Sequence, residues 1–161
     1  MIKRELSEQI KKASKKFPII GIVGPRQSGK TTLAKSIFKE YKYVNLEDPD
    51  VRLYAQEDPR GFLETYNSKV IIDEVQRVPE LFSYLQTHVD QVKKSGQFIL
   101  TGSQNFALME KVSQSLAGRI AIFSLLPLSF SELTDSKIKF SNFYEYLFRG
   151  SYPRVFDMNI M

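Results

Sequence analysis

The chain has 161 residues, 42% of them hydrophobic, and a formal net charge of +5, which suits a globular domain with a real core and excludes a fibrous or largely disordered chain. It contains no cysteine and one histidine, so disulfides are excluded and a zinc site is not expected. It has neither an apolar run of about 18 residues nor the apolar stretch of a signal peptide, so we expect a cytoplasmic protein without a membrane partner.

Most of the positive charge lies in the first 16 residues. This segment contains two acids, Glu5 and Glu8, and six cations: Lys3, Arg4, Lys11, Lys12, Lys15 and Lys16. Apolar residues recur at helical spacing from Ile2 to Phe17, which predicts a helix that packs one side on the domain. Its cations have two open interpretations, a solvated helix face or a contact with DNA phosphates.

After this helix, short apolar runs alternate with segments of helical periodicity. Strands are predicted at residues 18–23, 43–46, 70–72, 97–100 and 119–125. Helices are predicted at residues 30–39, 50–57 and 59–66, from residue 79 onward, and from the fourth strand to about residue 116. Pro79 suits the first position of its helix. The first run is almost continuously apolar, as in a strand buried on both faces of a parallel sheet. The alternation predicts an α/β fold with a parallel sheet.

A glycine-rich segment follows the first predicted strand. Gly24–Thr31, with the sequence GPRQSGKT, matches the Walker A pattern G-x-x-x-x-G-K-[ST] at every fixed position and opens a predicted helix. Gly24 and Gly29 let the backbone curl so that successive N–H groups and the helix N-terminus surround phosphate oxygens. Lys30 is expected to reach the β- and γ-phosphates, Thr31 to ligate Mg²⁺ and Thr32 to approach the α-phosphate.

The whole loop is therefore a candidate nucleotide site, comprising Gly24, Pro25, Arg26, Gln27, Ser28, Gly29, Lys30, Thr31 and Thr32. One member is ambiguous, because the Arg26 side chain could lean over a phosphate or be solvated.

The third predicted strand ends in Asp73 and Glu74. Ligands of open α/β sheets bind beyond the carboxyl ends of the strands, so Asp73 is expected to hold Mg²⁺ beside Thr31. Glu74 is expected to orient the attacking water and to accept its proton. Alone, the pair could be two solvated acids. Together with the phosphate loop it forms a Walker B pattern and favours ATP hydrolysis, because small nucleotide kinases and GTPases do not usually end this strand in Asp-Glu.

Polar residues also end the fourth strand and open the fifth. Thr101 or Ser103 could hydrogen-bond the γ-phosphate or the attacking water, although Ser103 could instead cap a helix. Arg119 could act on the site of a neighbouring subunit in a homo-oligomer as an arginine finger, or it could form a surface ion pair. His88 lies beside an apolar stripe and is interpreted as a packing or solvated residue.

The order of these motifs resembles the additional-strand P-loop ATPases of the broad AAA+ superfamily. More narrowly, it resembles a prokaryotic family in which an AAA-type ATPase domain precedes a poorly characterised C-terminal region. The resemblance rests on residues 24–32, 71–76, 100–103, 116–119 with 127–133, and 149–153. It implies a three-layer fold with sheet order 5-1-4-3-2, Thr101 or Ser103 as sensor 1, and Pro153 or Tyr152 beside the adenine.

We expect one ATPase domain with a basic N-terminal helix (1–17), a core (18–134) and the start of a C-terminal extension (135–161). Residues 143–148 suggest a helix, and the apolar residues that follow show no clear periodicity. Such a tail usually packs against other residues, so we expect the chain to be the N-terminal part of a longer protein; the alternative is a free terminus that docks on the domain's own core.

The expected function is Mg²⁺-dependent hydrolysis of ATP to ADP and phosphate, coupled to an unknown task and to a protein partner or the protein's own C-terminal region. The alternative is an ATP-binding switch with little turnover, which presents a surface to a protein or DNA partner.

Overall fold

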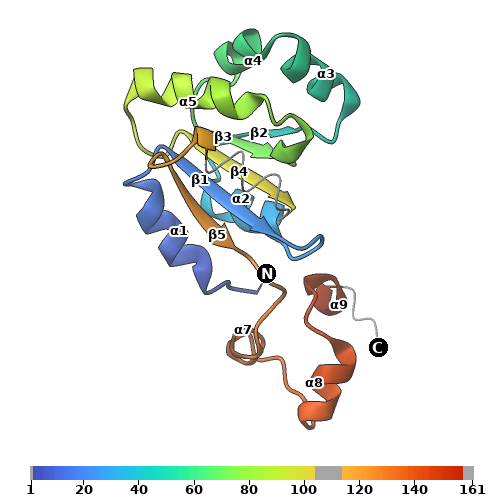
Figure 1. Ribbon diagram of the computed structural model, residues 1–161. Coiled ribbons are helices and arrows are strands. Elements are labelled where there is room, and N and C mark those ends of the chain that lie inside the picture. Colours follow the sequence, from blue (N-terminus) through green and yellow to red (C-terminus); the bar gives the residue numbers. More distant parts are fainter. Residues whose placement is uncertain (1, 104–113, 158–161) are drawn as a thin grey trace.

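A five-stranded parallel sheet forms the centre of the protein, in a computed structural model that describes residues 2–103 and 114–157. The strands are β1 (Ile19–Gly24), β2 (Lys42–Asn45), β3 (Val70–Asp73), β4 (Phe98–Ser103) and β5 (Ile120–Ser124). They run in the order β2-β3-β4-β1-β5 (Figure 1), and all four neighbouring pairs are parallel. The predicted α/β fold and sheet order are therefore confirmed.

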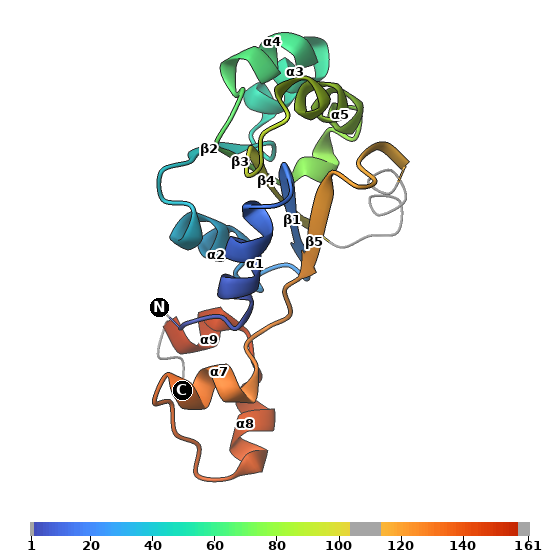
Figure 2. The ribbon, with the colours of Figure 1, turned by 90° about the vertical axis from the view of Figure 1, so that its left-hand side faces the viewer.

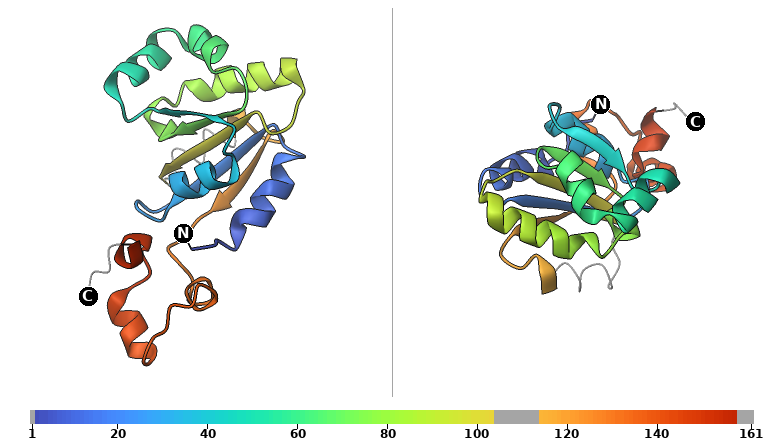
Figure 3. Two further views of the ribbon diagram at one scale, coloured as in Figure 1. Left: turned by 180° about the vertical axis from the view of Figure 1, so that it is seen from behind. Right: turned by 90° about the horizontal axis from the view of Figure 1, so that it is seen from above.

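Two apolar cores cover the two faces of the sheet, because side chains alternate along each buried strand. Ile20, Ile22 and Ile99 point to the face covered by α1 (Leu6–Ser14) and α2 (Lys30–Ile37). Ile19 and Phe98 point to the opposite face. That face is covered by α3 (Pro49–Glu57), α4 (Pro59–Thr65), the 3₁₀ turn η1 (Val75–Arg77) and α5 (Leu81–Val92). The view from above in Figure 3 shows the resulting three layers.

Local capping explains where several helices begin. Pro49 and Pro59 occupy first positions of α3 and α4, directly after Asp48 and Asp58. The Asp48 side chain accepts hydrogen bonds from the backbone N–H groups of Asp50 and Val51, and the Asp58 side chain accepts one from Gly61. This is the role of an N-cap.

Three short helices follow the last strand: α7 (Phe130–Asp135), α8 (Phe143–Arg149) and α9 (Pro153–Asp157). Ser129 and Glu132 form a reciprocal capping box at the start of α7. The three helices lie together below the sheet, beside the first residues of the chain (Figure 2). None of the described helices is long and apolar enough to cross a membrane.

Some predicted elements differ from the observed ones. Helix α5 begins at Leu81 rather than at Pro79, because Pro79 belongs to a turn in which Phe82 N donates to Pro79 O at 3.3 Å. Strand β4 continues to Ser103, since Gly102 and Ser103 pair with the end of β1. The helix predicted after β4 falls mostly outside the described residues.

The interpretation of the N-terminal cations as a solvated face is wrong for one residue. Five of the six cations are exposed, but Arg4 is 8% exposed. It is buried because its guanidinium has hydrogen-bond acceptors inside the protein.

Candidate functional site

The phosphate loop joins the end of β1 to the start of α2, and glycine is required at both of its fixed glycine positions. Gly24 has a φ of +153°, and a Cβ there would lie 2.2 Å from the carbonyl oxygen of Leu125. Gly29 has a φ of +92° and occupies the N-cap position of α2. Gln27, between them, also has a positive φ of 62°. The backbone therefore curls tightly, as an anion-binding nest requires.

Lys30 folds back across this loop from the first turn of α2. Its Nζ donates to the carbonyl oxygens of Gly24 at 3.1 Å and Pro25 at 2.7 Å. Burial lowers the pKa of Lys30, while the negative charges of Glu74 and Asp73 oppose this shift. The loop thus holds a desolvated cation whose partners are neutral carbonyl groups.

Asp73 lies at the carboxyl end of β3 and is 5% exposed. Its Oδ2 accepts hydrogen bonds from Thr31 Oγ1 at 2.9 Å and from the Tyr43 hydroxyl at 2.8 Å. Its Oδ1 accepts hydrogen bonds from Thr101 Oγ1 and from the backbone N–H of Glu74. Three predicted site residues, Thr31, Asp73 and Thr101, therefore meet on one carboxylate.

Tyr43 was missed by the sequence analysis. It lies on β2, whose residues Val44 and Asn45 pair with Ile72 and Asp73. Its pKa is raised, mainly by burial and then by the hydrogen bond to Asp73, so the phenol remains a donor. The Nζ of Lys35 lies 3.3 Å from the centre of the ring. Only the neighbouring position of β2 and β3 reveals this residue, because no sequence motif includes it.

Glu74 follows Asp73 in the left-handed region, with a φ of 55°. Few residues other than glycine adopt this conformation, and those that do cluster at active sites and ligand-binding segments. The Nε2 of Gln76 donates to Glu74 Oε2. Gln76 is a second contact that the sequence analysis did not foresee.

The remaining loop residues differ in exposure. Ser28 is fully buried, Pro25 is half-buried, and Arg26, Gln27 and Thr32 are exposed.

Ser103 pairs with Gly24 at the end of β4. Its alternative role as a helix cap involves residues outside the described part of the chain.

Arg119 lies at the opposite end of the sheet from the phosphate loop. Its carbonyl accepts a hydrogen bond from Ile19 N, at the start of β1. Its guanidinium pairs with Asp90, Nε to Oδ1 at 2.7 Å and Nη2 to Oδ2 at 2.8 Å. This hydrogen bonding lowers the pKa of Asp90. Within one chain Arg119 is thus in a surface ion pair, and its action on a neighbouring subunit stays a prediction.

A hollow of about 230 Å³ adjoins the phosphate loop. Gly29 and residues of α2 form one side, the N-terminal segment forms another, and Leu128 and Pro153 form the third. Pro153 is close to the loop, because a Cβ on Gly29 would lie 3.7 Å from its Cγ. The N-terminal wall, which the sequence analysis did not predict, consists of Ile2, Lys3, Arg4 and Ser7.

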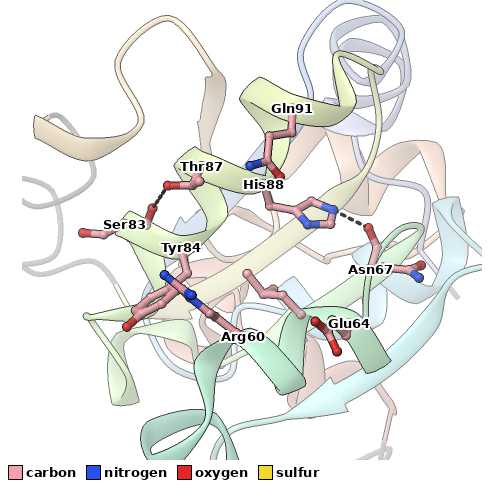
Figure 4. A pocket seen from close by; sticks show the side chains of 9 residues that line it. Arg60, Glu64, Asn67, Ser83, Tyr84, Thr87, His88 and Gln91 are labelled. Carbon is pink, nitrogen blue, oxygen red and sulfur yellow. Dashed lines mark hydrogen bonds between the residues drawn. The ribbon is translucent and has the colours of Figure 1, made fainter.

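A larger hollow of about 860 Å³ lies between α4 and α5 (Figure 4). His88 lines it, hydrogen-bonds the carbonyl oxygen of Asn67 at 2.8 Å and packs edge-on against Phe98. None of the residues predicted to bind nucleotide or metal lines this hollow. It is therefore separate from the candidate site.

The sheet order and the phosphate loop define a P-loop nucleotide-binding fold. Residues 16–134 match the AAA domain family, and the chain belongs to that family. Its curated relatives include the uncharacterised proteins Rv2008c of Mycobacterium tuberculosis and Mb2031c of Mycobacterium bovis. Each is 30% identical over 135 residues, which are 83% of this chain and 31% of the relative. The chain thus spans about a third of the length of these relatives.

Solved structures share the fold at low sequence identity. AMPPCP-bound DnaA from Aquifex aeolicus aligns with a TM-score of 0.60 and 17% identity, over 95% of this chain and 58% of that one. A DNA replication initiation factor gives a TM-score of 0.57 and 16% identity, over 96% and 57%. The Walker-type ATPase PABY2304 of Pyrococcus abyssi gives 0.56 and 16%, over 87% and 60%. These similarities concern the fold alone.

Proposed function

We propose that the protein binds ATP with Mg²⁺ at the phosphate loop and hydrolyses it to ADP and phosphate. The observation that carries this proposal is the 2.9 Å contact between Thr31 Oγ1 and Asp73 Oδ2. It joins the phosphate loop to the acid of a different strand, at the carboxyl edge of the sheet where ligands of this fold class bind. Membership of the AAA domain family supports the same function.

The residues present suit a magnesium ion. Mg²⁺ prefers oxygen ligands and is usually held by one or two carboxylates together with substrate phosphates and water. The Thr31 hydroxyl and the Asp73 carboxylate supply two such oxygens side by side. Among the described residues, no group of three or more His, Asp or Glu side chains forms a metal cage. When bound, the ion would neutralise charge that develops on the β- and γ-phosphates.

The protein's own side chains have distinct roles in this proposal. The curled loop and the N-terminus of α2 bind phosphate oxygens, and the Lys30 ammonium exchanges its carbonyl partners for the β- and γ-phosphates. Glu74 orients water and accepts its proton. Thr101 fixes the Asp73 carboxylate. The hollow of about 230 Å³ beside Gly29 and Pro153 receives the base. ATP is proposed because AMPPCP, bound by the structurally similar DnaA, is an ATP analogue.

A Glu74→Gln variant tests this reaction. It should bind ATP with unchanged affinity but hydrolyse it about 10²–10⁴-fold more slowly, because the glutamine cannot accept a proton. Phosphate release and calorimetric binding measure the two quantities. Glu57→Gln, at an exposed glutamate of α3, is the matched control and should behave like wild type. Equal rates for wild type and Glu74→Gln would remove Glu74 as the base.

The alternative function is a binding switch with little turnover. The hydrogen bond from Gln76 to Glu74 favours it, because a carboxylate oxygen of the proposed base already accepts this bond instead of one from water. A single-turnover experiment separates the two functions: a burst of phosphate supports hydrolysis, and intact bound ATP after hours supports the switch.

A further inference from the structure

Arg4 makes contacts that extend well beyond the N-terminal segment. Its Nη1 donates to the carbonyl oxygen of Ser28, inside the phosphate loop, at 2.8 Å. Its Nη2 donates to the carbonyl oxygens of Leu126 at 2.6 Å and Pro127 at 3.4 Å, in the segment between β5 and α7. Its Nε donates to Glu132 Oε1 in α7 at 3.0 Å. One guanidinium therefore connects the N-terminal segment to the phosphate loop and to residues 126–132, which are remote from each other in sequence.

Glu132 completes this arrangement and is 5% exposed. Besides Arg4, its Oε1 accepts the backbone N–H of Glu5 at 2.8 Å, and its Oε2 accepts that of Ser129 at 3.0 Å. The carboxylate is thus neutralised by a cation and satisfied by N–H donors. Removing one partner of such a buried pair leaves an uncompensated charge, so the two residues hold each other in place.

The contacts of this pair reach all three sides of the hollow beside the phosphate loop. Arg4 belongs to the N-terminal wall and anchors it to the loop through Ser28. The contacts with Pro127 and Glu132 secure the chain on either side of Leu128, in the third wall. Leu128 N donates in turn to the carbonyl oxygen of Ser151 at 2.8 Å, two residues before Pro153. The first residues of the chain, α7 and α9 accordingly lie side by side in Figure 2.

We propose that Arg4 and Glu132 form a clamp that holds the two outer walls of this hollow against the phosphate loop and thereby determines the affinity for the nucleoside part of ATP. This inference rests on the proposed function and adds to it a positioning residue. The described donors of Arg4 are directed at carbonyl oxygens and a carboxylate, so Arg4 shapes the base site rather than contacting phosphate. The triphosphate is bound by different groups, namely Lys30, Thr31 and the loop amides.

The test compares two ligands, ATP and inorganic tripolyphosphate, each titrated calorimetrically in the presence of Mg²⁺. In wild type, ATP should bind more tightly because its base fills the hollow. Arg4→Gln should weaken ATP binding at least about tenfold, whereas tripolyphosphate binding should change by less than about threefold. Lys12→Gln removes the same charge from an exposed position on α1 and should leave both affinities unchanged.

A double-mutant cycle with Glu132→Gln tests whether the two residues act as a unit. The loss in ATP affinity should be strongly non-additive in the double variant, because either change alone opens the clamp. If Arg4→Gln does not fold, Arg4→Lys carries the same prediction for the two ligands, because lysine keeps the charge that neutralises Glu132 but lacks the planar set of N–H donors that joins the walls. Equal losses for ATP and tripolyphosphate, or an unchanged ATP affinity, would overturn the clamp. If wild type binds neither ligand, the proposed function itself fails and the clamp fails with it.

Discussion

Two buried carboxylates organise different regions of this protein, and the side chains that hydrogen-bond to them differ in kind. Asp73 accepts bonds from the hydroxyl groups of Thr31, Tyr43 and Thr101 and from the backbone N–H of Glu74. Glu132 accepts bonds from the Arg4 guanidinium and from two backbone N–H groups. Among the described residues, hydroxyl and backbone N–H groups bond Asp73 and no cationic side chain does, so its charge suits the proposed metal ion. The charge of Glu132 is already neutralised by Arg4, so the role of Glu132 is structural.

A Glu132→Gln variant tests the structural role of this carboxylate. The amide –NH₂ of glutamine cannot accept hydrogen bonds, so it would confront N–H donors and leave Arg4 without its counter-charge. We expect the free energy of unfolding to fall by about 3–5 kcal/mol, measured by urea denaturation. The control is Glu8→Gln, at an exposed glutamate of α1, which should stay within about 0.5 kcal/mol of wild type. An equally stable Glu132→Gln variant would show that the carboxylate is not structural.

Asp73→Asn should have the opposite effect, with a small change in stability and a large loss of hydrolysis. The asparagine –NH₂ would face hydroxyl oxygens, which can accept as well as donate, so we expect unfolding free energy within about 1 kcal/mol of wild type. Hydrolysis should fall at least about a hundredfold, because the proposed metal ligand is lost. The same urea experiment and a phosphate-release assay give both quantities. A large loss of stability with little loss of activity would reverse the roles assigned to the two carboxylates.

The smallest effect is expected at the exposed pair of Arg119 and Asp90. Arg119 lowers the pKa of Asp90, so the pair contributes stability above the ordinary carboxyl pKa, and this contribution is lost as the pH falls through the lowered value. Arg119→Ala should return the Asp90 pKa to its ordinary range, as followed by NMR titration, with a slight loss of stability. ATPase activity should hardly change. A fall of about 10³-fold would instead indicate an arginine finger acting on another subunit.

The parts of the candidate site that are contiguous in the chain could be predicted from the sequence. Gly24–Thr31 and the Asp73-Glu74 pair each form a local pattern, and strand alternation predicted the parallel sheet that brings them together. Tyr43 and Arg4 follow no such pattern, because their roles depend on the pairing of β2 with β3 and on the position of α7. Arg4 in particular was indistinguishable from its solvated neighbours, since the acceptor that buries it lies 128 positions further along the chain.

The contacts of the C-terminal helices also could not be predicted from local sequence patterns. Pro153 was expected near the base only through a family resemblance, and the structure places it beside Gly29. The capping box of α7, Ser129 and Glu132, has a sequence pattern that can be recognised. The sequence does not reveal that the same glutamate also binds Arg4. The division of the chain into an N-terminal helix, a core and an extension stays a proposal, as does a partner protein or DNA.

The proposed function depends most directly on Asp73, which is assigned to a metal ion that binds together with the nucleotide. Calorimetric titration of wild-type protein with AMPPCP, in Mg²⁺ and in EDTA, tests this without any hydrolysis. We predict tighter binding in Mg²⁺, by at least about tenfold, and loss of that difference in Asp73→Asn. Equal affinities in Mg²⁺ and EDTA for the wild-type protein would contradict the role of Asp73 and with it the proposed site.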